Sequence, residues 1–209
     1  KKIFGVIPAR NEAASVAGVV AAVSPYFSRV VVVDDGSEDK TGDLAARQGA
    51  LILRHLVNRG QGAALETGNE FARRHDADIV VHFDADGQFC AADLPAVLDP
   101  LLKDEADAGF GSRFLGKESN MPRTKKYLLY PVAKLVNRLF FGVKLSDPQI
   151  GFRALNKKAM NSFRIELDGY AHCTEIMYKV FRKGLRVREV PVQVKYSEFG
   201  LGFRGGVRI

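Results

Sequence analysis

Short apolar, β-branched runs alternate with longer helical patterns over the first hundred residues, and this alternation constrains the fold more than any other feature. It is typical of strand-helix-strand units around a mostly parallel sheet. We therefore expect an α/β, Rossmann-like fold in which helices flank the sheet. The expected strands are 3–8, 30–34, 50–54, 79–83 and 108–111, and the expected helices are 12–23, 40–48, 62–74 and 92–101. Asp39 and Asp93 are expected to accept backbone N–H groups at helix N-termini.

The pattern changes after Arg113. Residues 123–141 mix apolar and basic side chains, which is typical of a helix lying on anionic lipid and, more often, of a helix packing on a domain core. A helix at 171–183 and strands at 186–190 and 192–196 complete the prediction. No linker, repeat or low-complexity tract is present, so residues 1–209 are expected to form one domain. The sequence begins without Met, so a fragment of a longer protein is one interpretation of it, and membrane segments beyond residue 209 stay an open alternative.

Charge is distributed unevenly along the chain. Residues 1–111 carry 11 basic and 17 acidic side chains, whereas residues 112–209 carry 20 basic and 7 acidic ones. The basic second half indicates an anionic partner, which could be nucleic acid, anionic lipid or a phosphate-bearing substrate. A basic face that only contacts water is an equally good interpretation of charge alone.

Several classes of site are poorly supported. Cys90 and Cys173 are far apart and lack the spacing of a zinc site or a disulfide framework, which indicates ordinary free cysteines. No glycine-rich dinucleotide motif and no P-loop follows any expected strand. His82 lies within an apolar run and is interpreted as a core histidine, while His172, beside Tyr170 and Glu175, is a candidate for lining an acceptor site.

Two aspartates directly follow the apolar run 79–83. Asp84 and Asp86 are separated by one residue and are followed by Gly87 and Gln88. Ligands of open α/β sheets bind beyond the carboxyl ends of the strands, so these carboxylates are expected at a binding crevice. Closely spaced carboxylates are ligands that suit Mg²⁺ or Mn²⁺. An isolated pair of this kind is usually only solvated, but the position at a strand end strengthens the prediction of a metal site.

Two other expected strands end in polar residues. The strand 30–34 ends at Asp34 and is followed by Asp35, Gly36 and Ser37, which are suited to hydrogen bonding with ribose hydroxyls or a base edge. The first strand leads into residues 8–12. We expect three loops to bring polar groups to one edge of the sheet.

Six ordered segments together resemble glycosyltransferase family 2, and within it the polyprenyl-phosphate sugar transferases of the dolichyl-phosphate mannosyltransferase type. The resemblance covers nearly the whole chain. The segments are Pro8-Ala9-Arg10-Asn11-Glu12, Val33-Asp34-Asp35-Gly36-Ser37, Asn58-Arg59-Gly60-Gln61-Gly62, Asp84-Ala85-Asp86-Gly87-Gln88, Gly111-Ser112-Arg113 and Asp147-Pro148-Gln149-Ile150-Gly151-Phe152-Arg153. The sequence departs from the family pattern at Arg10, where Tyr is commoner, and at Phe89-Cys90.

The resemblance implies a GT-A fold for residues 1–209 and roles for individual residues. Asp84, Asp86 and Gln88 would bind Mg²⁺ or Mn²⁺. Asp147 would be a catalytic base or an acceptor-orienting group. Arg113 would act in catalysis and, with Arg123 or Lys125, would bind the acceptor phosphate. The nucleotide-sugar contacts would be Pro8, Ala9, Asn11, Glu12, Asp35, Gly36, Gly62 and Asp84.

The expected reaction is an inverting sugar transfer from a nucleotide-sugar, of the GDP-mannose or UDP-glucose type, to a polyprenyl or dolichyl phosphate at the cytoplasmic face of a membrane. A polysaccharide or protein acceptor would share every donor motif and stays an alternative. A nucleotidyltransferase is disfavoured because its glycine-rich loop is missing. A nucleic-acid-binding module is disfavoured because acidic residues fill the expected crevice and no aromatic platform is evident. An ion-pair role for Arg113 is as well supported as phosphate binding.

Overall fold

The computed structural model describes residues 1–115, 145–147 and 149–195. Its strands form one seven-stranded sheet in the order β3-β2-β1-β4-β6-β5-β7. The strands are β1 (Ile3–Ala9), β2 (Arg29–Asp34), β3 (Leu51–Arg54), β4 (Ile79–His82), β5 (Ala108–Ser112), β6 (Arg153–Asn156) and β7 (Val187–Pro191). β6 pairs antiparallel with β4 and with β5, and the other described pairs are parallel. The expected α/β architecture with a mostly parallel sheet is confirmed.

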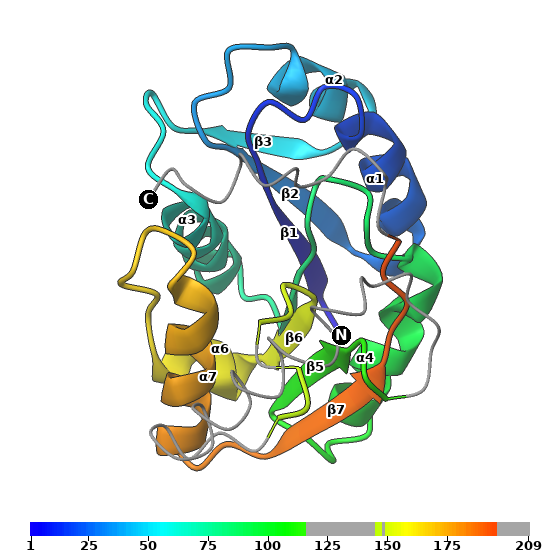
Figure 1. The fold of residues 1–209 in the computed structure, drawn as a ribbon, viewed down its shortest axis with the longest axis vertical. Coiled ribbons are helices and arrows are strands. Elements are labelled where there is room, and N and C mark those ends of the chain that lie inside the picture. The colour runs from blue at the N-terminus through cyan, green and yellow to red at the C-terminus, as the bar shows by residue number, and fades with distance from the viewer. Residues whose placement is uncertain (116–144, 148, 196–209) are drawn as a thin grey trace, which may run out of the picture.

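Helices cover both faces of the sheet (Figure 1). They are α1 (Val16–Val23), α2 (Thr41–Arg47), α3 (Gln61–Arg74), α4 (Leu94–Leu102), α6 (Lys157–Ser162) and α7 (His172–Arg182), with short 3-10 turns at Ser24–Tyr26 and Ala91–Asp93. α3, α6 and α7 lie on one side, and α1 and α4 lie on the other (Figure 1). None of the helices in the described part of the chain has the length and apolar character needed to cross a membrane.

Burial on both faces explains why the first strands read as unbroken apolar runs. Val31, Val32 and Val33 of β2 and Val80 and Val81 of β4 have no exposed surface. α3 approaches β1 closely at Gly68, where a Cβ atom would collide with the side chain of Val6. The core therefore sits between the sheet and its helices and holds the strand ends rigidly.

Three local expectations need correction. The strand β6 and the helix α6 that follows it were not predicted. Residues 192–195 form no strand, and the only described pairing there is the isolated bridge between Phe89 and Val194. Asp93 lies in the first turn of the 3-10 helix and at the N-cap position of α4, as expected, but its carboxylate makes no side-chain cap bond to α4 and accepts the Gln193 backbone N–H at 2.6 Å. The predicted helix at 123–141 lies outside the described residues.

The prediction for Asp39 is confirmed. Its Oδ1 accepts the backbone N–H of Thr41, the first residue of α2, at 2.9 Å. Its Oδ2 accepts the backbone N–H of Ala13 at 3.1 Å. Asp39 therefore joins the loop after β1 to the start of α2, which helps fix the edge of the sheet where the polar loops meet.

Candidate active site

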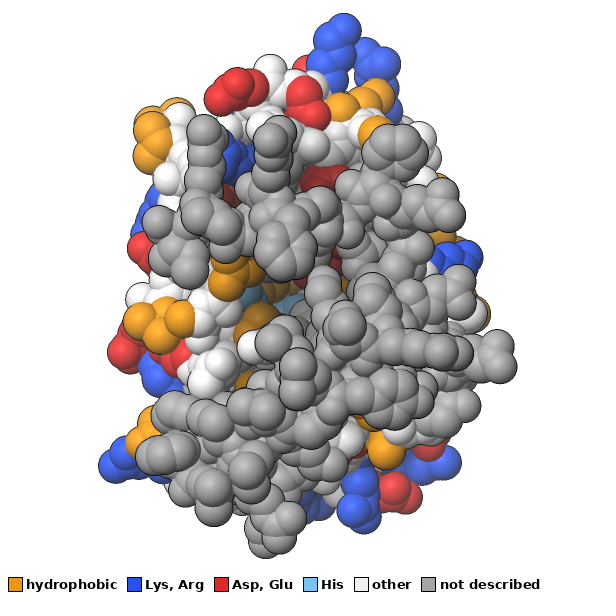
Figure 2. All heavy atoms as spheres, viewed as in Figure 1, with side chains coloured by type: hydrophobic (Ala, Val, Ile, Leu, Met, Phe, Trp, Pro, Cys, Tyr) orange, Lys and Arg blue, Asp and Glu red, His pale blue; other side chains and the backbone are white. Residues whose placement is uncertain are grey.

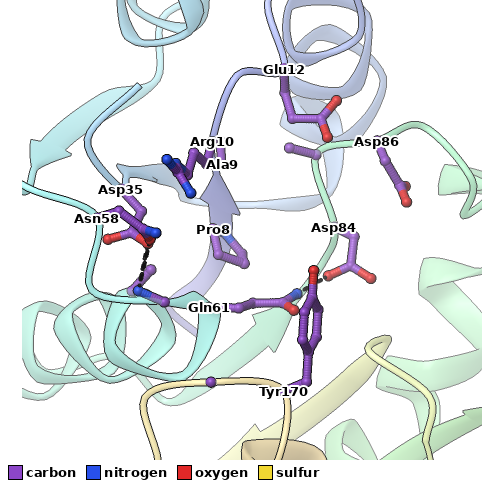
Figure 3. A pocket seen from close by; sticks show the side chains of 14 residues that line it. Pro8, Ala9, Arg10, Glu12, Asp35, Asn58, Gln61, Asp84, Asp86 and Tyr170 are labelled. Carbon is purple, nitrogen blue, oxygen red and sulfur yellow. Dashed lines mark hydrogen bonds between the residues drawn. The ribbon is translucent and has the colours of Figure 1, made fainter. Parts of the chain in front are cut away.

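A pocket of about 550 Å³ opens at the carboxyl ends of β1, β2 and β4, where the chain order of the strands reverses from β2-β3 on one side to β4 on the other. This edge of a doubly wound sheet is the usual ligand site. Figure 3 shows polar side chains from several loops directed into the pocket. It is lined by Pro8, Ala9, Arg10, Glu12, Asp35, Asn58, Gly60, Gln61, Ala64, Asp84, Ala85, Asp86, Gly169 and Tyr170.

Asp84 and Asp86 both reach this pocket, as the sequence predicted. Asp84 is partly buried and its Oδ1 accepts a hydrogen bond from Gln61 Nε2 at 2.9 Å. Asp86 is exposed, and its Oδ1 accepts the backbone N–H of Gln88 at 2.9 Å across a turn in which Gly87 has a φ of 74°. Burial and, secondarily, the neighbouring Asp86 carboxylate raise the pKa of Asp84 to about 7. Although Asp86 is exposed at the pocket surface, the surrounding protein partly desolvates its carboxyl group and raises its pKa as well.

This pair of carboxylates fits a divalent cation. Two negative groups close together, one of them partly desolvated, are stabilised when a cation is placed between them. Within the described residues no group of three or more His, Cys, Asp or Glu side chains converges on one point. The protein would therefore supply two carboxylates, and ligand oxygens and water would complete an oxygen shell of the kind Mg²⁺ prefers.

Asp35 lies at the opposite end of the pocket and is only 4% exposed. Its Oδ1 lies 2.7 Å from His55 Nδ1 and accepts the backbone N–H of Arg59, and its Oδ2 accepts the backbone N–H of Gly60 at 2.7 Å. His55 Nε2 lies 2.9 Å from the hydroxyl of Thr67 on α3. Asp35 therefore fixes the loop that carries Asn58, which also lines the pocket.

Asn11, Gly36 and Gly62 are not among the lining residues, although each is adjacent in the chain to a residue that lines the pocket. Asn11 has a φ of 55°, its backbone N–H donates to Ser37, and its Oδ1 accepts the backbone N–H of Glu38, so it ties two loops together. Gly36 has a φ of 68°, and a Cβ atom there would lie 2.8 Å from the backbone nitrogen of Asn58. Pro8, Ala9 and Glu12, which are expected to contact the nucleotide-sugar, line the pocket.

The structure places Arg113 and Asp147 together but not among the residues that line the pocket. Arg113 Nε donates to Asp147 Oδ2 at 2.6 Å, and Arg113 Nη2 donates to Asp147 Oδ1 at 2.7 Å. Asp147 has no exposed surface. A two-point pair of this kind is strong and orients the guanidinium. Arg113 therefore forms an ion pair, which is one of its two expected roles. Arg123 and Lys125 lie outside the described residues.

Sequence reasoning gave no pocket role to Asn58, Gly60, Gln61 and Tyr170. The first three belong to the segment before α3 that carried part of the family resemblance, so a signal for them existed. Tyr170 had no comparable signal.

His172 lies 0% exposed and donates Nδ1–H to the Gly169 carbonyl at 2.8 Å, and it does not line the pocket. His82 is a core histidine, as predicted, and its Nε2 bonds to Asn69 at 2.8 Å.

The described residues on the face shown in Figure 2 carry their basic side chains mostly at the outer edge. Among the described residues that line the pocket, Glu12, Asp35, Asp84 and Asp86 contribute carboxylates and Arg10 contributes a guanidinium. A bound cation would offset the repulsion between these carboxylates and a polyanionic ligand. Cys90 and Cys173 are free thiols, as expected.

Comparison with known proteins identifies relatives of this chain. A protein of Methanocaldococcus jannaschii described as uncharacterized is 34% identical over 96% of this chain and 84% of its own length. The Methanococcus voltae UDP-N-acetylglucosamine--dolichyl-phosphate N-acetylglucosaminyltransferase is 30% identical over 96% of this chain and 88% of its own. The Micrococcus luteus undecaprenyl-phosphate mannosyltransferase is 30% identical over 95% and 86%.

Solved structures share the fold. Mycobacterium tuberculosis glucosyl-3-phosphoglycerate synthase superposes with a TM-score of 0.77 and 23% identity over 98% of this chain and 75% of that protein. A structure of the same enzyme with Mn²⁺, UDP and glucosyl-3-phosphoglycerate gives a TM-score of 0.78 at 22% identity over 98% of this chain and 74% of that one. The likeness supports the expected GT-A fold.

The family model for glycosyl transferase family 2 matches residues 6–163, which include the loops after β1, β2 and β4 and the strand β6. This range covers more than half of the sequence. The chain belongs to glycosyl transferase family 2 and is a glycosyltransferase.

Proposed function

We propose that the chain transfers a sugar from a nucleotide-sugar donor, of the GDP-mannose or UDP-glucose type, to a polyprenyl or dolichyl phosphate. The observation that carries the proposal is the pair Asp84 and Asp86 at the end of β4, in a pocket large enough for such a donor. Support for a lipid phosphate acceptor comes from the names of the M. voltae and M. luteus relatives.

The donor would lie across the carboxyl edge of the sheet. Its nucleoside would contact Pro8, Ala9, Glu12 and Asp35, which line the pocket. Asn11, Gly36 and Gly62, which are adjacent in the chain to lining residues, would also contribute to nucleotide-sugar binding. Asp84 and Asp86, with Gln88 beside them, would hold Mg²⁺ or Mn²⁺ against the diphosphate. When bound, such an ion neutralises the negative charge that develops on the leaving diphosphate.

The transfer is an in-line displacement. An oxygen of the acceptor phosphate forms a bond to the anomeric carbon while the bond from that carbon to the diphosphate breaks on the opposite face, which inverts the configuration. A phosphate oxygen is already anionic near neutral pH, so no strong base is needed. Asp147, whose two oxygens are engaged by Arg113, suits an orienting role better than proton abstraction.

The acceptor phosphate would be bound by Arg113, which Asp147 holds just beyond the end of β5, together with Arg123 and Lys125. A paired guanidinium keeps its positive charge and a fixed direction, as phosphate recognition requires. A lipid acceptor would place the reaction at a membrane surface, and we propose the cytoplasmic face.

Product extraction tests the proposal. Purified protein is incubated with Mn²⁺, polyprenyl phosphate and labelled GDP-mannose, UDP-glucose or UDP-N-acetylglucosamine. We expect label from one donor to move into the organic phase, and Asp86→Ala to abolish both this transfer and Mn²⁺-dependent donor binding. Asp99→Ala is the matched control, because Asp99 is exposed on α4 and pairs with Lys103.

Two results would contradict the proposal. Normal transfer by Asp86→Ala would exclude the cation role of the β4 carboxylates. Transfer of label to a polysaccharide added in a parallel incubation, with no organic-phase product from any donor, would exclude the lipid phosphate acceptor.

A further inference from the structure

Tyr170 lines the pocket with a large aromatic side chain that is 87% exposed. Its ring is therefore accessible to a ligand that binds in the pocket, and contact with a ligand would bury a large apolar surface. Leu167, three residues earlier, is 48% exposed but does not line the pocket.

The segment 165–170, which carries Tyr170, is held in place by Glu175 of α7. Glu175 is 8% exposed, its Oε1 accepts the backbone N–H of Glu166 at 2.8 Å, and its Oε2 accepts that of Leu167 at 2.9 Å. Lys179 Nζ lies 2.7 Å from Glu175 Oε1 and completes the charge pairing. Charge-assisted bonds from a buried carboxylate to two successive backbone groups hold a segment firmly.

α3 fixes the same segment from the other side. Gly62 donates its backbone N–H to the Asp168 carbonyl at 2.7 Å, and a Cβ atom on Gly62 would collide with the Leu167 carbonyl oxygen. Glu66 Oε2 accepts the backbone N–H of Ile165 at 2.9 Å. The loop before α7 is thus rigid, although it presents an exposed aromatic ring.

The ring and the proposed cation site belong to the same pocket. In the view of Figure 3 the Tyr170 ring is drawn between Gln61 and Asp84, with its hydroxyl end level with the Asp84 carboxylate, and Gln61 Nε2 donates to Asp84 Oδ1 at 2.9 Å. The nucleoside end at Asp35 lies across the pocket (Figure 3). The donor's sugar is bonded to the phosphate farther from the nucleoside, so a diphosphate held at Asp84 and Asp86 brings the sugar next to Tyr170.

We propose that Tyr170 is the platform on which the pyranose ring of the donor rests, and that Glu175 is a positioning residue that acts through the loop. The inference rests on the proposed function, because it assumes a nucleotide-sugar donor. The C–H groups on one face of a pyranose carry partial positive charge and suit the electron-rich face of an aromatic ring. Tyr170 would therefore contribute to recognition of the sugar but not of the nucleotide.

Binding measurements without acceptor separate these contributions. Isothermal titration with Mn²⁺ compares UDP with UDP-N-acetylglucosamine and GDP with GDP-mannose. We expect Tyr170→Ala to raise the dissociation constant of the nucleotide-sugar about threefold to tenfold, the range typical of one aromatic contact, and to change that of the free nucleotide less than twofold. Tyr170→Phe should bind like the wild type, because the ring is retained. Leu167→Ala is the matched control on the same loop and should change neither constant.

Glu175→Gln tests the positioning role. It should weaken nucleotide-sugar binding selectively while free nucleotide binding stays within twofold, whereas general damage to the fold would weaken both. The inference is overturned if Tyr170→Ala changes both constants by the same factor, or neither, while the wild type still binds nucleotide; the proposed function survives that result. If the wild type binds neither nucleotide nor nucleotide-sugar with Mn²⁺, the proposed function itself fails.

Discussion

At the scale of single residues, Gly151 shows how little freedom the Asp84 carboxylate has. A Cβ atom at position 151 would lie 2.5 Å from Asp84 Oδ2. The Gly151 carbonyl is held at 3.1 Å by Nε of Arg153, a guanidinium that is 1% exposed and whose Nη1 has no partner within the described residues. The carboxylate therefore rests against a backbone that is itself anchored, and only glycine leaves room for it.

This contact predicts that Gly151→Ala displaces the Asp84 carboxylate. We expect Mn²⁺-dependent binding of UDP or GDP to weaken at least about tenfold, a loss of the size associated with disturbing groups that orient metal ligands. Titration with and without Mn²⁺ measures the effect. Gly18→Ala is the control, because Gly18 lies on α1 and a Cβ atom there meets nothing within 4 Å. Unchanged Mn²⁺-dependent binding by Gly151→Ala would show that the carboxylate can move without loss.

At the scale of elements, the sequence predicts the parallel strands well and the antiparallel one poorly. β1, β2, β4 and β5 are buried along nearly their whole length, and such strands read as apolar runs. β6 has four residues and begins with Arg153, which pairs directly with His82 of β4. A charged residue at this position gives no indication in the sequence of a buried strand. Only the tertiary structure shows that this arginine is buried.

The sequence likewise predicts one part of the candidate site, the carboxylates, and misses another part, Tyr170. Carboxylates at strand ends were predicted to meet because parallel strands share one edge, and Asp35, Asp84 and Asp86 do line one pocket. Tyr170 was not assigned to the pocket because the path of its loop depends on Gly62, Glu66 and Glu175, which are distant in the sequence or buried. Contacts between distant segments leave no local pattern to read.

Asp107, just before β5, joins the elements of the second half of the sheet. The carboxylate accepts hydrogen bonds from the Arg186 backbone and side chain, Asn156 Nδ2 and Lys158 Nζ. Burial acts to raise the pKa of this carboxyl, but the hydrogen bonds from Arg186 and the others hold it well below its ordinary value. Asp107 is only 1% exposed.

Asp107→Asn should therefore destabilise the protein by about 1.5–3 kcal/mol, because it removes the negative charge of a buried carboxylate that accepts several hydrogen bonds. The midpoint of urea unfolding measures this loss, with Asp99→Asn as the control for an exposed ion pair, which should cost less than about 1 kcal/mol. Equal midpoints for the two variants would contradict the role given to Asp107. Nucleotide binding by the folded Asp107→Asn protein should be normal, since this carboxylate lies outside the pocket lining.

At the scale of the whole molecule, His172 and Asp84 make the stability of the fold depend on pH in opposite directions. Burial, and then the charge of Arg153, lower the pKa of His172 to about 4 from an ordinary 6.5, so the folded state excludes a proton that the unfolded chain binds. Stability therefore falls as pH drops from 6.5 toward 4. Asp84 acts in the opposite direction. Its pKa is raised from 3.8 to about 7, so the folded state retains a proton and stability falls as pH rises through that window.

The two effects partly cancel in the wild type, and Asp84→Asn removes one of them. We expect the urea midpoint of Asp84→Asn to rise more steeply between pH 5 and 6.5 than that of the wild type in metal-free buffer. The variant should also be more stable than the wild type at pH 8, where a buried charge has been removed. Parallel pH profiles for the two proteins would rule out a strongly raised pKa for Asp84.

The described lining of the pocket has a consequence for how proteins of this kind diverge. Apart from Gly169 and Tyr170, every lining residue comes from positions 8–86. Under the proposed function, substitutions elsewhere in the later part of the chain can change which molecule receives the sugar, while the donor contacts at positions 8–86 and at Tyr170 are retained. Such a division allows an ancestral gene to give rise to enzymes that share a donor and differ in their products.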